Sequence, residues 1–161
     1  RGKVLGGSSS INGLVYIRGQ RQDFDHWRQC GATGWGYDDV LPYFFKAEDQ
    51  ARGADAFHGI GGPLKVSDQS EPHPLCDAFI AAAAQAGHPV NPDFNGTSQE
   101  GVGVYQINTK DGMRMSAARA FLRPAMKRPK SRAAAASRSS RPPTSVIRRW
   151  TASPRASRFA C

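Results

Sequence analysis

The sequence has few cysteines and no long apolar run. Three cysteines in 161 residues are too few and too scattered for a disulfide framework or a structural zinc site: Cys30, Cys76 and Cys161. No stretch is apolar over the length that a bilayer requires, and the first residues show no signal-peptide pattern. We therefore expect no disulfide-stapled domain and no transmembrane segment, and a reduced, cytoplasmic setting.

Acidic side chains are absent from residues 130–161, although these carry eight of the 22 basic residues. The rest of the chain has 14 basic and 13 acidic residues, so the net charge of +9 belongs to this C-terminal tail. A nearly neutral body gives no reason to expect a nucleic-acid partner. The tail is mostly Arg, Ala, Ser and Pro, a composition that cannot offset its ordering entropy, and we expect it to be disordered.

Apolar spacing and boundary residues predict four helices. They are expected over residues 8–18, from a cap at Asp38 onward, from Pro74 to Gly87, and from a cap at Ser116 to Met126. The first segment is rich in β-branched side chains, so a strand remains open as an alternative there. The last helix is expected to be kinked or broken near Pro124.

Two strands are predicted between these helices, over Leu64–Ser67 and within the alternating segment "GVYQINTK", residues 103–110. Residues 20–37 mix charge, glycine and aromatic side chains, and we expect them to form an extended surface excursion. The resulting order is helix, helix, strand, helix, strand, helix. It predicts a mixed α/β protein.

The segment "KVLGGSSSINGLVYIRG", residues 3–19, concentrates glycine and small polar residues in front of apolar ones. A P-loop would need Gly-Lys-Ser/Thr, and the dinucleotide fingerprint G-x-G-x-x-G is absent here. What remains is a diglycine turn that feeds a helix N-terminus, where free N–H groups favour negative charge, or else a plain structural loop. Because the chain begins at Arg1 directly on this motif, we expect it to be a piece of a longer protein.

The stretch "GKVLGGSSSINGLVYIRGQRQDFD", residues 2–25, resembles the first sequence signature of the glucose–methanol–choline (GMC) flavoprotein oxidoreductases. Three later segments follow in the order typical of the choline- and alcohol-dehydrogenase branch: "GATGWGYDDVLPYFFKAED", "HGIGGPLKVSD" and "DGMRMSAARAFLRPAMKRP". The resemblance extends over residues 1–129. It implies a two-domain α/β flavoprotein with a Rossmann-like FAD-binding domain and a substrate domain built on an antiparallel sheet.

The same resemblance implies how the chain is divided. Residues 1–60 are expected to belong to the FAD-binding domain. Residues 61–129 are expected to form the start of the substrate domain and to return toward the FAD-binding domain, and residues 130–161 are expected to be a basic low-complexity tail. The implied activity is FAD-dependent oxidation of a primary alcohol, with hydride transfer to the flavin N5. The histidine base of the family falls beyond this sequence, so no catalytic residue and no metal ligand is assigned, and the fragment is expected to be inactive. The substrate is a small-molecule alcohol, and the electron acceptor stays open.

Carried over by position, the FAD contacts of the family fall on Val4, Asn12, Gly13, Leu14 and Val15. The residues of the diglycine turn, Gly6, Gly7 and Ser8, complete the expected cofactor-binding set. The two glycines let the backbone approach the cofactor closely, and Asn12 supplies an amide. Some members of the family have a histidine just before this asparagine that bonds covalently to FAD. Ile11 occupies that position here, so the implied FAD is non-covalent.

Other polar residues receive structural interpretations. None of the four histidines has a spaced partner that would indicate a metal site: His26, His58, His73 and His88. We expect His58 to lie near the domain junction without touching substrate, and His26 to pack beside Trp27. Arg114 is interpreted as a loop residue and Ser116 as a helix cap.

Three interpretations of the basic tail remain open: nucleic-acid binding, contact with an acidic membrane surface, or no function. Arg, Ala, Ser and Pro are also the residues that GC-rich DNA encodes when it is read out of frame. A frameshift near Pro129 to Ser131 is therefore our hypothesis for the tail. The main alternative to the enzyme is a non-enzymatic protein that binds nucleic acid through this tail.

Overall fold

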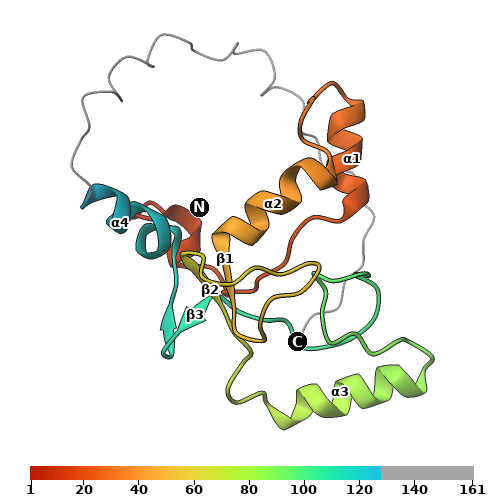
Figure 1. Ribbon diagram of the computed structural model, residues 1–161. Helices are drawn as coiled ribbons and strands as arrows, with labels where there is room; N and C mark the ends of the chain where they lie inside the picture. The colour runs from red at the N-terminus through yellow and green to blue at the C-terminus, as the bar shows by residue number, and fades with distance from the viewer. Residues whose placement is uncertain (128–161) are drawn as a thin grey trace.

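The computed structural model of the protein describes residues 1–127, and the expectations for the tail lie outside these residues. Short helices and strands alternate along the chain, as the mixed α/β class predicts (Figure 1). The helical segments are the 3-10 helix η1 (Gly7–Ser10), α1 (Arg21–Gln29), α2 (Tyr37–Ala47), α3 (Pro74–Gln85), the π-helix η2 (Ala118–Leu122) and α4 (Arg123–Met126). The strands are β1 (Glu48–Gln50), β2 (Leu64–Val66), β3 (Thr109–Lys110) and β4 (Met113–Arg114).

The strands form two separate ladders. β1 and β2 pair in parallel, with Asp49 opposite Lys65, and β2 confirms the strand predicted from Leu64. β3 and β4 form an antiparallel hairpin. Its turn residues Asp111 and Gly112 both have positive φ, as a tight two-residue hairpin turn requires.

Isolated bridges connect these ladders to the N-terminal segment. Ile107, just before β3, bridges both Ser67, which follows β2, and Val15. The lateral order is therefore β1, β2, Ile107 and Val15. It brings the N-terminal loop beside residues some ninety positions later in the chain.

The helix predicted over residues 8–18 is wrong. Only Gly7–Ser10 is helical, and Leu14 has a φ of 70°, which a right-handed helix excludes. The N–H of Tyr16 donates to the carbonyl of Gln106 at 2.8 Å, so the segment is extended and paired with a distant part of the chain. The strand that the β-branched residues left open describes this segment better.

The surface excursion predicted over residues 20–37 is also wrong, because it contains α1. The Asp23 carboxylate accepts the N–H of Gln20 at 2.8 Å and closes a capping box at the start of the helix. Phe24 is the buried residue of α1, and its ring centroid lies 5.8 Å from that of Phe44 in α2. This aromatic contact joins α1 to α2.

The next helix, α2, begins slightly earlier than predicted. Its N-cap is Gly36 rather than Asp38, because the Asp39 carboxylate accepts the N–H of Gly36 at 3.0 Å. Asp38 instead forms a two-pronged ion pair with Arg21 of α1. The predicted apolar helix is confirmed, and only its cap is corrected.

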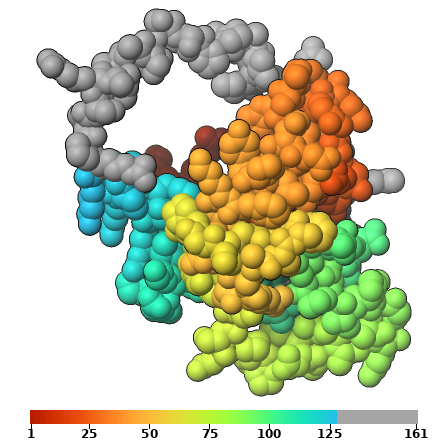
Figure 2. Space-filling view, viewed as in Figure 1, coloured from red at the N-terminus to blue at the C-terminus, as the bar shows by residue number. Residues whose placement is uncertain are grey.

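The predicted helix from Pro74 is confirmed as α3, and Gly87, with a φ of 90°, follows its end. Figures 1 and 2 show α3 at the lower end of the molecule, away from α1 and α2. Among the described residues none in α3 is buried, and Leu75 on its apolar stripe is 70% exposed. α3 therefore adds little to the core.

The C-terminal helix is present but irregular. The Ser116 hydroxyl accepts the N–H of Arg119 at 3.3 Å, which confirms the predicted cap. The helix begins as the π-helix η2 and changes to the α-helix α4 at Arg123, so its regular geometry changes next to Pro124. In the part of the chain that the structure covers, no helix has the length and apolar character needed to cross a membrane.

Polar side chains occupy much of the interior. The buried apolar residues are few: Phe24, Tyr37, Val66, Phe94, Met115, Ala118 and Ala120. Between β1 and the surrounding loops lies what we call the buried polar cluster: Arg18, Glu48, Gln50, His58 and Gln106. Its hydrogen bonds hold together segments that little apolar packing connects.

Candidate functional site

The diglycine turn has a backbone shape that only glycine adopts easily. Gly6 and Gly7 have φ angles of 94° and 59°, both in the left-handed region. A Cβ on Gly6 would also lie 2.5 Å from the Ser10 hydroxyl and 3.0 Å from the Cβ of Ala118. The turn is therefore closed by two glycines, one of which packs against the start of η2.

Asn12 stands directly after this turn and is exposed. Its side-chain oxygen Oδ1 accepts the N–H of Leu14 at 3.2 Å and an N–H of the Arg114 guanidinium at 2.8 Å. The first of these bonds stabilises Leu14 in its left-handed conformation, which a leucine rarely adopts. Strained backbone of this kind gathers at binding sites.

Gly13 lies between these two residues in open space. A Cβ there would meet no described atom within 4 Å, and the φ of Gly13 lies outside the left-handed region. Neither internal packing nor backbone conformation thus requires glycine at this position. A flat group that approaches the backbone from outside would require it.

Apolar side chains around the turn are exposed as well. Ile11 is 62% exposed. The exposed large apolar residues of this segment are Val4, Leu5, Ile11, Val15 and Ile17. An exposed apolar patch next to an unfilled glycine fits a large, planar, partly apolar ligand or a covering domain.

Residues 114–118, which we call the backing segment, contact the turn and support it. Arg114 reaches the Ser9 carbonyl at 3.3 Å in addition to Asn12. The Ser9 hydroxyl accepts the N–H of Ala117 at 2.9 Å and donates to the Gly6 carbonyl at 2.6 Å. The backing segment therefore fixes both the turn and the asparagine.

The sequence analysis missed this role of Arg114, which it interpreted as a loop residue. The two contacting residues are 102 positions apart, and no local pattern links them. The expected helix N-terminus is also missing, because η1 is only a four-residue 3-10 turn. Positive charge at this loop comes instead from the Arg114 guanidinium.

A second polar arrangement, the buried polar cluster, has a structural role. Arg18 pairs with Glu48 at 2.7 Å, and both side chains are almost fully buried. His58 is 4% exposed and lies between two carboxylates, with Nδ1 3.1 Å from Glu48 and Nε2 2.9 Å from Asp93. Burial lowers the pKa of His58, but its hydrogen bonds to Asp93 and Glu48 outweigh this and raise the pKa to about 9. An imidazolium whose two ring nitrogens both donate hydrogen bonds has no free nitrogen to act as a base.

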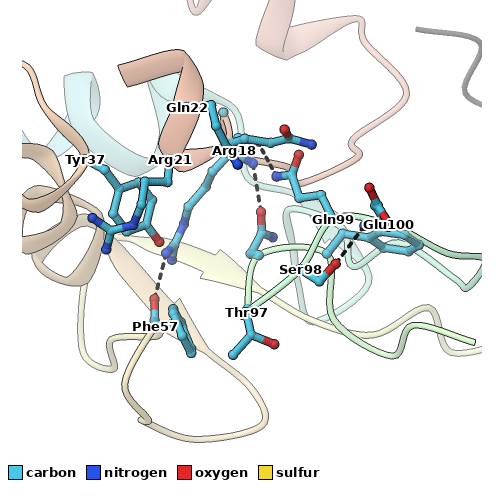
Figure 3. Close-up of a pocket in the computed structure, with 14 residues that line it drawn as sticks. Arg18, Arg21, Gln22, Tyr37, Phe57, Thr97, Ser98, Gln99 and Glu100 are labelled. Carbon is cyan, nitrogen blue, oxygen red and sulfur yellow. Dashed lines mark hydrogen bonds between the residues drawn. The ribbon is translucent and has the colours of Figure 1, made fainter. Parts of the chain in front are cut away.

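A polar cavity of about 270 Å³ lies beside this cluster (Figure 3). The Asn95 side-chain oxygen accepts the N–H of Arg18 at 2.8 Å, and the Gln99 amide donates to the Arg18 carbonyl at 2.7 Å. Figure 3 shows Gln99 directed at the Arg18 backbone and the Arg18 side chain directed at Phe57. None of the eight predicted cofactor residues lines this cavity.

The structure thus brings the predicted cofactor residues together in one exposed loop. They remain a prediction as cofactor contacts. Gly13 and Asn12 offer open backbone and an amide, whereas Gly6 and Gly7 shape the turn. Among the described residues no group of His, Cys, Asp and Glu side chains is arranged to hold a metal ion.

Comparison with known proteins identifies the family to which the chain belongs. It belongs to the GMC oxidoreductase family, whose sequence model matches residues 1–141. The oxygen-dependent choline dehydrogenase of Brucella ovis is 54% identical over 129 residues, which are 80% of this chain and 24% of that protein. The chain therefore spans about a quarter of the length of the curated relatives it matches.

Solved structures show the same fold. Pyridoxine 4-oxidase from Mesorbium loti is 39% identical with a TM-score of 0.74, over 81% of this chain and 26% of that one. An FAD-dependent oxidoreductase from Chaetomium thermophilum is 27% identical with a TM-score of 0.69, over 77% of this chain and 24% of that one. The family resemblance and the α/β class predicted from sequence are confirmed.

Proposed function

We propose that this chain is the flavin-contacting part of an FAD-dependent oxidoreductase that acts on a primary alcohol of the choline type. The alcohol class is supported by the choline dehydrogenase of Brucella ovis, which is 54% identical over the shared region. The observation that carries the proposal is the exposed loop in which Gly13 leaves space beside a fixed asparagine amide. The activity belongs to the whole protein, of which these residues supply one side of the cofactor site.

The residues present fit an isoalloxazine ring. The open backbone at Gly13 admits a flat ring at close range, the exposed side chain of Asn12 offers a donor, and the apolar patch around the turn covers ring carbon atoms. The residues assigned to this contact are Val4, Gly6, Gly7, Ser8, Asn12, Gly13, Leu14 and Val15. FAD bound there supplies the acceptor for the hydride that leaves the alcohol carbon.

The role of the chain itself is to position and shield. Residues 4–18, which we call the cofactor loop, contain no histidine, and His58 is buried between two carboxylates, so neither supplies the base. Ile11, next to Asn12, has no nucleophilic atom, which supports non-covalent FAD. Residues 1–60 and 61–129 are proposed to belong to the FAD-binding and substrate domains, which would meet where Val15 bridges Ile107.

A graft into a complete enzyme tests this proposal. Residues 1–129 of this chain replace the matching segment of the Brucella ovis choline dehydrogenase, and the product is purified. We expect a yellow protein whose flavin is released into the supernatant by acid precipitation, and whose flavin absorbance is bleached by choline under anaerobic conditions. A flavin that stays with the precipitate would contradict non-covalent binding.

The control is the same graft with Gly13→Leu, which fills the open space beside Asn12. We expect this variant to be folded by circular dichroism and colourless. If the unmodified graft is folded and colourless, the loop does not bind flavin and the proposed function is wrong. If both grafts are equally yellow, Gly13 is not a point of close approach.

A further inference from the structure

The amide of Asn12 is held in one orientation. Its Oδ1 accepts two N–H groups, from Leu14 and from Arg114, so the oxygen faces the chain. The side-chain NH2 group points to the other side, and it donates to no described residue. Because the two ends of an amide differ only in hydrogen-bonding character, the two inward donors decide which end is presented outward.

Arg114 is itself well placed to impose this orientation. It lies in β4, where Met115 next to it is buried and donates its N–H to the Asn108 carbonyl at 2.9 Å. The guanidinium then spans two points of the loop, the Ser9 carbonyl and the Asn12 oxygen. Both bonds are donated by one nitrogen, Nη1, and the planar guanidinium fixes the directions of its two hydrogens.

The charge of Arg114 is not neutralised within the described part of the chain. Every ion pair found there involves another cation: Arg18, Arg21, Arg28, Arg52, His58 or Lys65. Arg114 therefore brings a positive charge to the base of the cofactor loop that no described carboxylate cancels. Such a charge favours whichever state of a nearby ligand is more negative.

We propose that Arg114 is the positioning residue of the cofactor loop. It turns the Asn12 amide so that the NH2 group faces the cofactor, and its charge favours the reduced, more negative flavin. This inference rests on the proposed function, because it presumes that the cofactor lies against the loop.

The test uses the grafted enzyme with Arg114→Gln, Arg114→Lys, Asn12→Ala and the double variant Arg114→Gln/Asn12→Ala. FAD affinity is measured on the apoprotein by quenching of flavin fluorescence, and the midpoint potential by redox titration with reference dyes. We expect Arg114→Gln to bind FAD about tenfold more weakly, as the loss of one charge-assisted hydrogen bond implies. Its midpoint potential is expected to be lower. Arg114→Lys keeps the charge, and therefore the potential, while losing part of the affinity.

The double variant separates positioning from a direct contact. If Arg114 acts through Asn12, adding Arg114→Gln to Asn12→Ala weakens binding by less than about twofold further. Arg123→Gln, which removes the same charge from an exposed position of α4, is the matched control and is expected to leave both quantities unchanged.

Two results would overturn the positioning role. One is an Arg114→Gln enzyme with the affinity and potential of the Arg123→Gln control, and the other is a fully additive loss of affinity in the double variant. Should Arg114→Gln fail to fold, the Arg114→Lys enzyme decides, because unchanged affinity there shows that the fixed geometry of the guanidinium does not position the loop. A graft that takes up no flavin before any substitution refutes the proposed function instead, and this inference with it.

Discussion

Raising the pH is expected to destabilise this protein through a single histidine. In the folded chain His58 lies between Glu48 and Asp93 and has a pKa of about 9, against 6.5 for a free histidine. Because the folded-state pKa is the higher one, the stabilisation is fully present below pH 6.5 and is lost as the pH rises through about 9. A shift of this size corresponds to about 3 kcal/mol at 1.36 kcal/mol per unit. Asp93 is 27% exposed, so water screens part of the interaction and we expect about 2 kcal/mol.

The assay is unfolding of the chain by urea, monitored by tryptophan fluorescence. It is performed at about pH 6 and about pH 9.5, just below and just above the window in which His58 loses its proton. The native chain is expected to lose about 2 kcal/mol of unfolding free energy between them. His58→Gln should be less stable at the lower pH and should show little change across the window. His88→Gln, an exposed histidine, is the matched control and should behave as the native chain does. An equal loss of stability in the native chain and in His58→Gln would refute the argument.

Three further substitutions test other parts of the structure. Gly13→Leu should leave the urea midpoint of the chain unchanged, because a side chain there meets no described atom within 4 Å, and a lower midpoint would show that the space is filled. Ser9→Ala removes the bonds to Gly6 and Ala117 and should cost about 1–2 kcal/mol of unfolding free energy, and no loss would mean that the backing segment is held by other contacts. Glu48→Gln leaves Arg18 buried without its counter-charge and should cost about 3 kcal/mol in the same assay, against little for the exposed control Glu71→Gln. If Glu48→Gln and Glu71→Gln lose equal amounts of unfolding free energy, the Arg18–Glu48 ion pair does not stabilise the protein.

Features encoded locally were predictable from the sequence. Pro74 in a first turn and Gly87 after a last turn bound α3 as predicted, since both act through their own backbone. The segment after Gly7 was misjudged because its conformation is decided by pairing with residues near Gln106, which no local periodicity reports. α1 was missed because its surface is largely polar and Phe24 is its one buried side chain.

The candidate site also combines residues that a local signature predicts with a residue that only a distant contact reveals. The eight predicted cofactor residues lie close together in the sequence, so one family signature assigns all of them, and they stay a prediction. Arg114 contacts that loop from 102 positions away, and its role depends on the hairpin that carries it. Even the charge at the site was expected from a helix N-terminus, whereas the structure supplies it through a side chain.

Directional bonds rather than apolar packing hold the cofactor loop in place. Its front is fixed through Ser9 and Asn12 by the backing segment, and its far end is fixed where Asn95 and Gln99 bond the Arg18 backbone. Hydrogen bonds are directional, whereas contacts between apolar side chains are not. The large apolar side chains between these anchors remain exposed. If the proposed function holds, a loop built in this way keeps its shape without the cofactor and loses little conformational entropy when the cofactor binds.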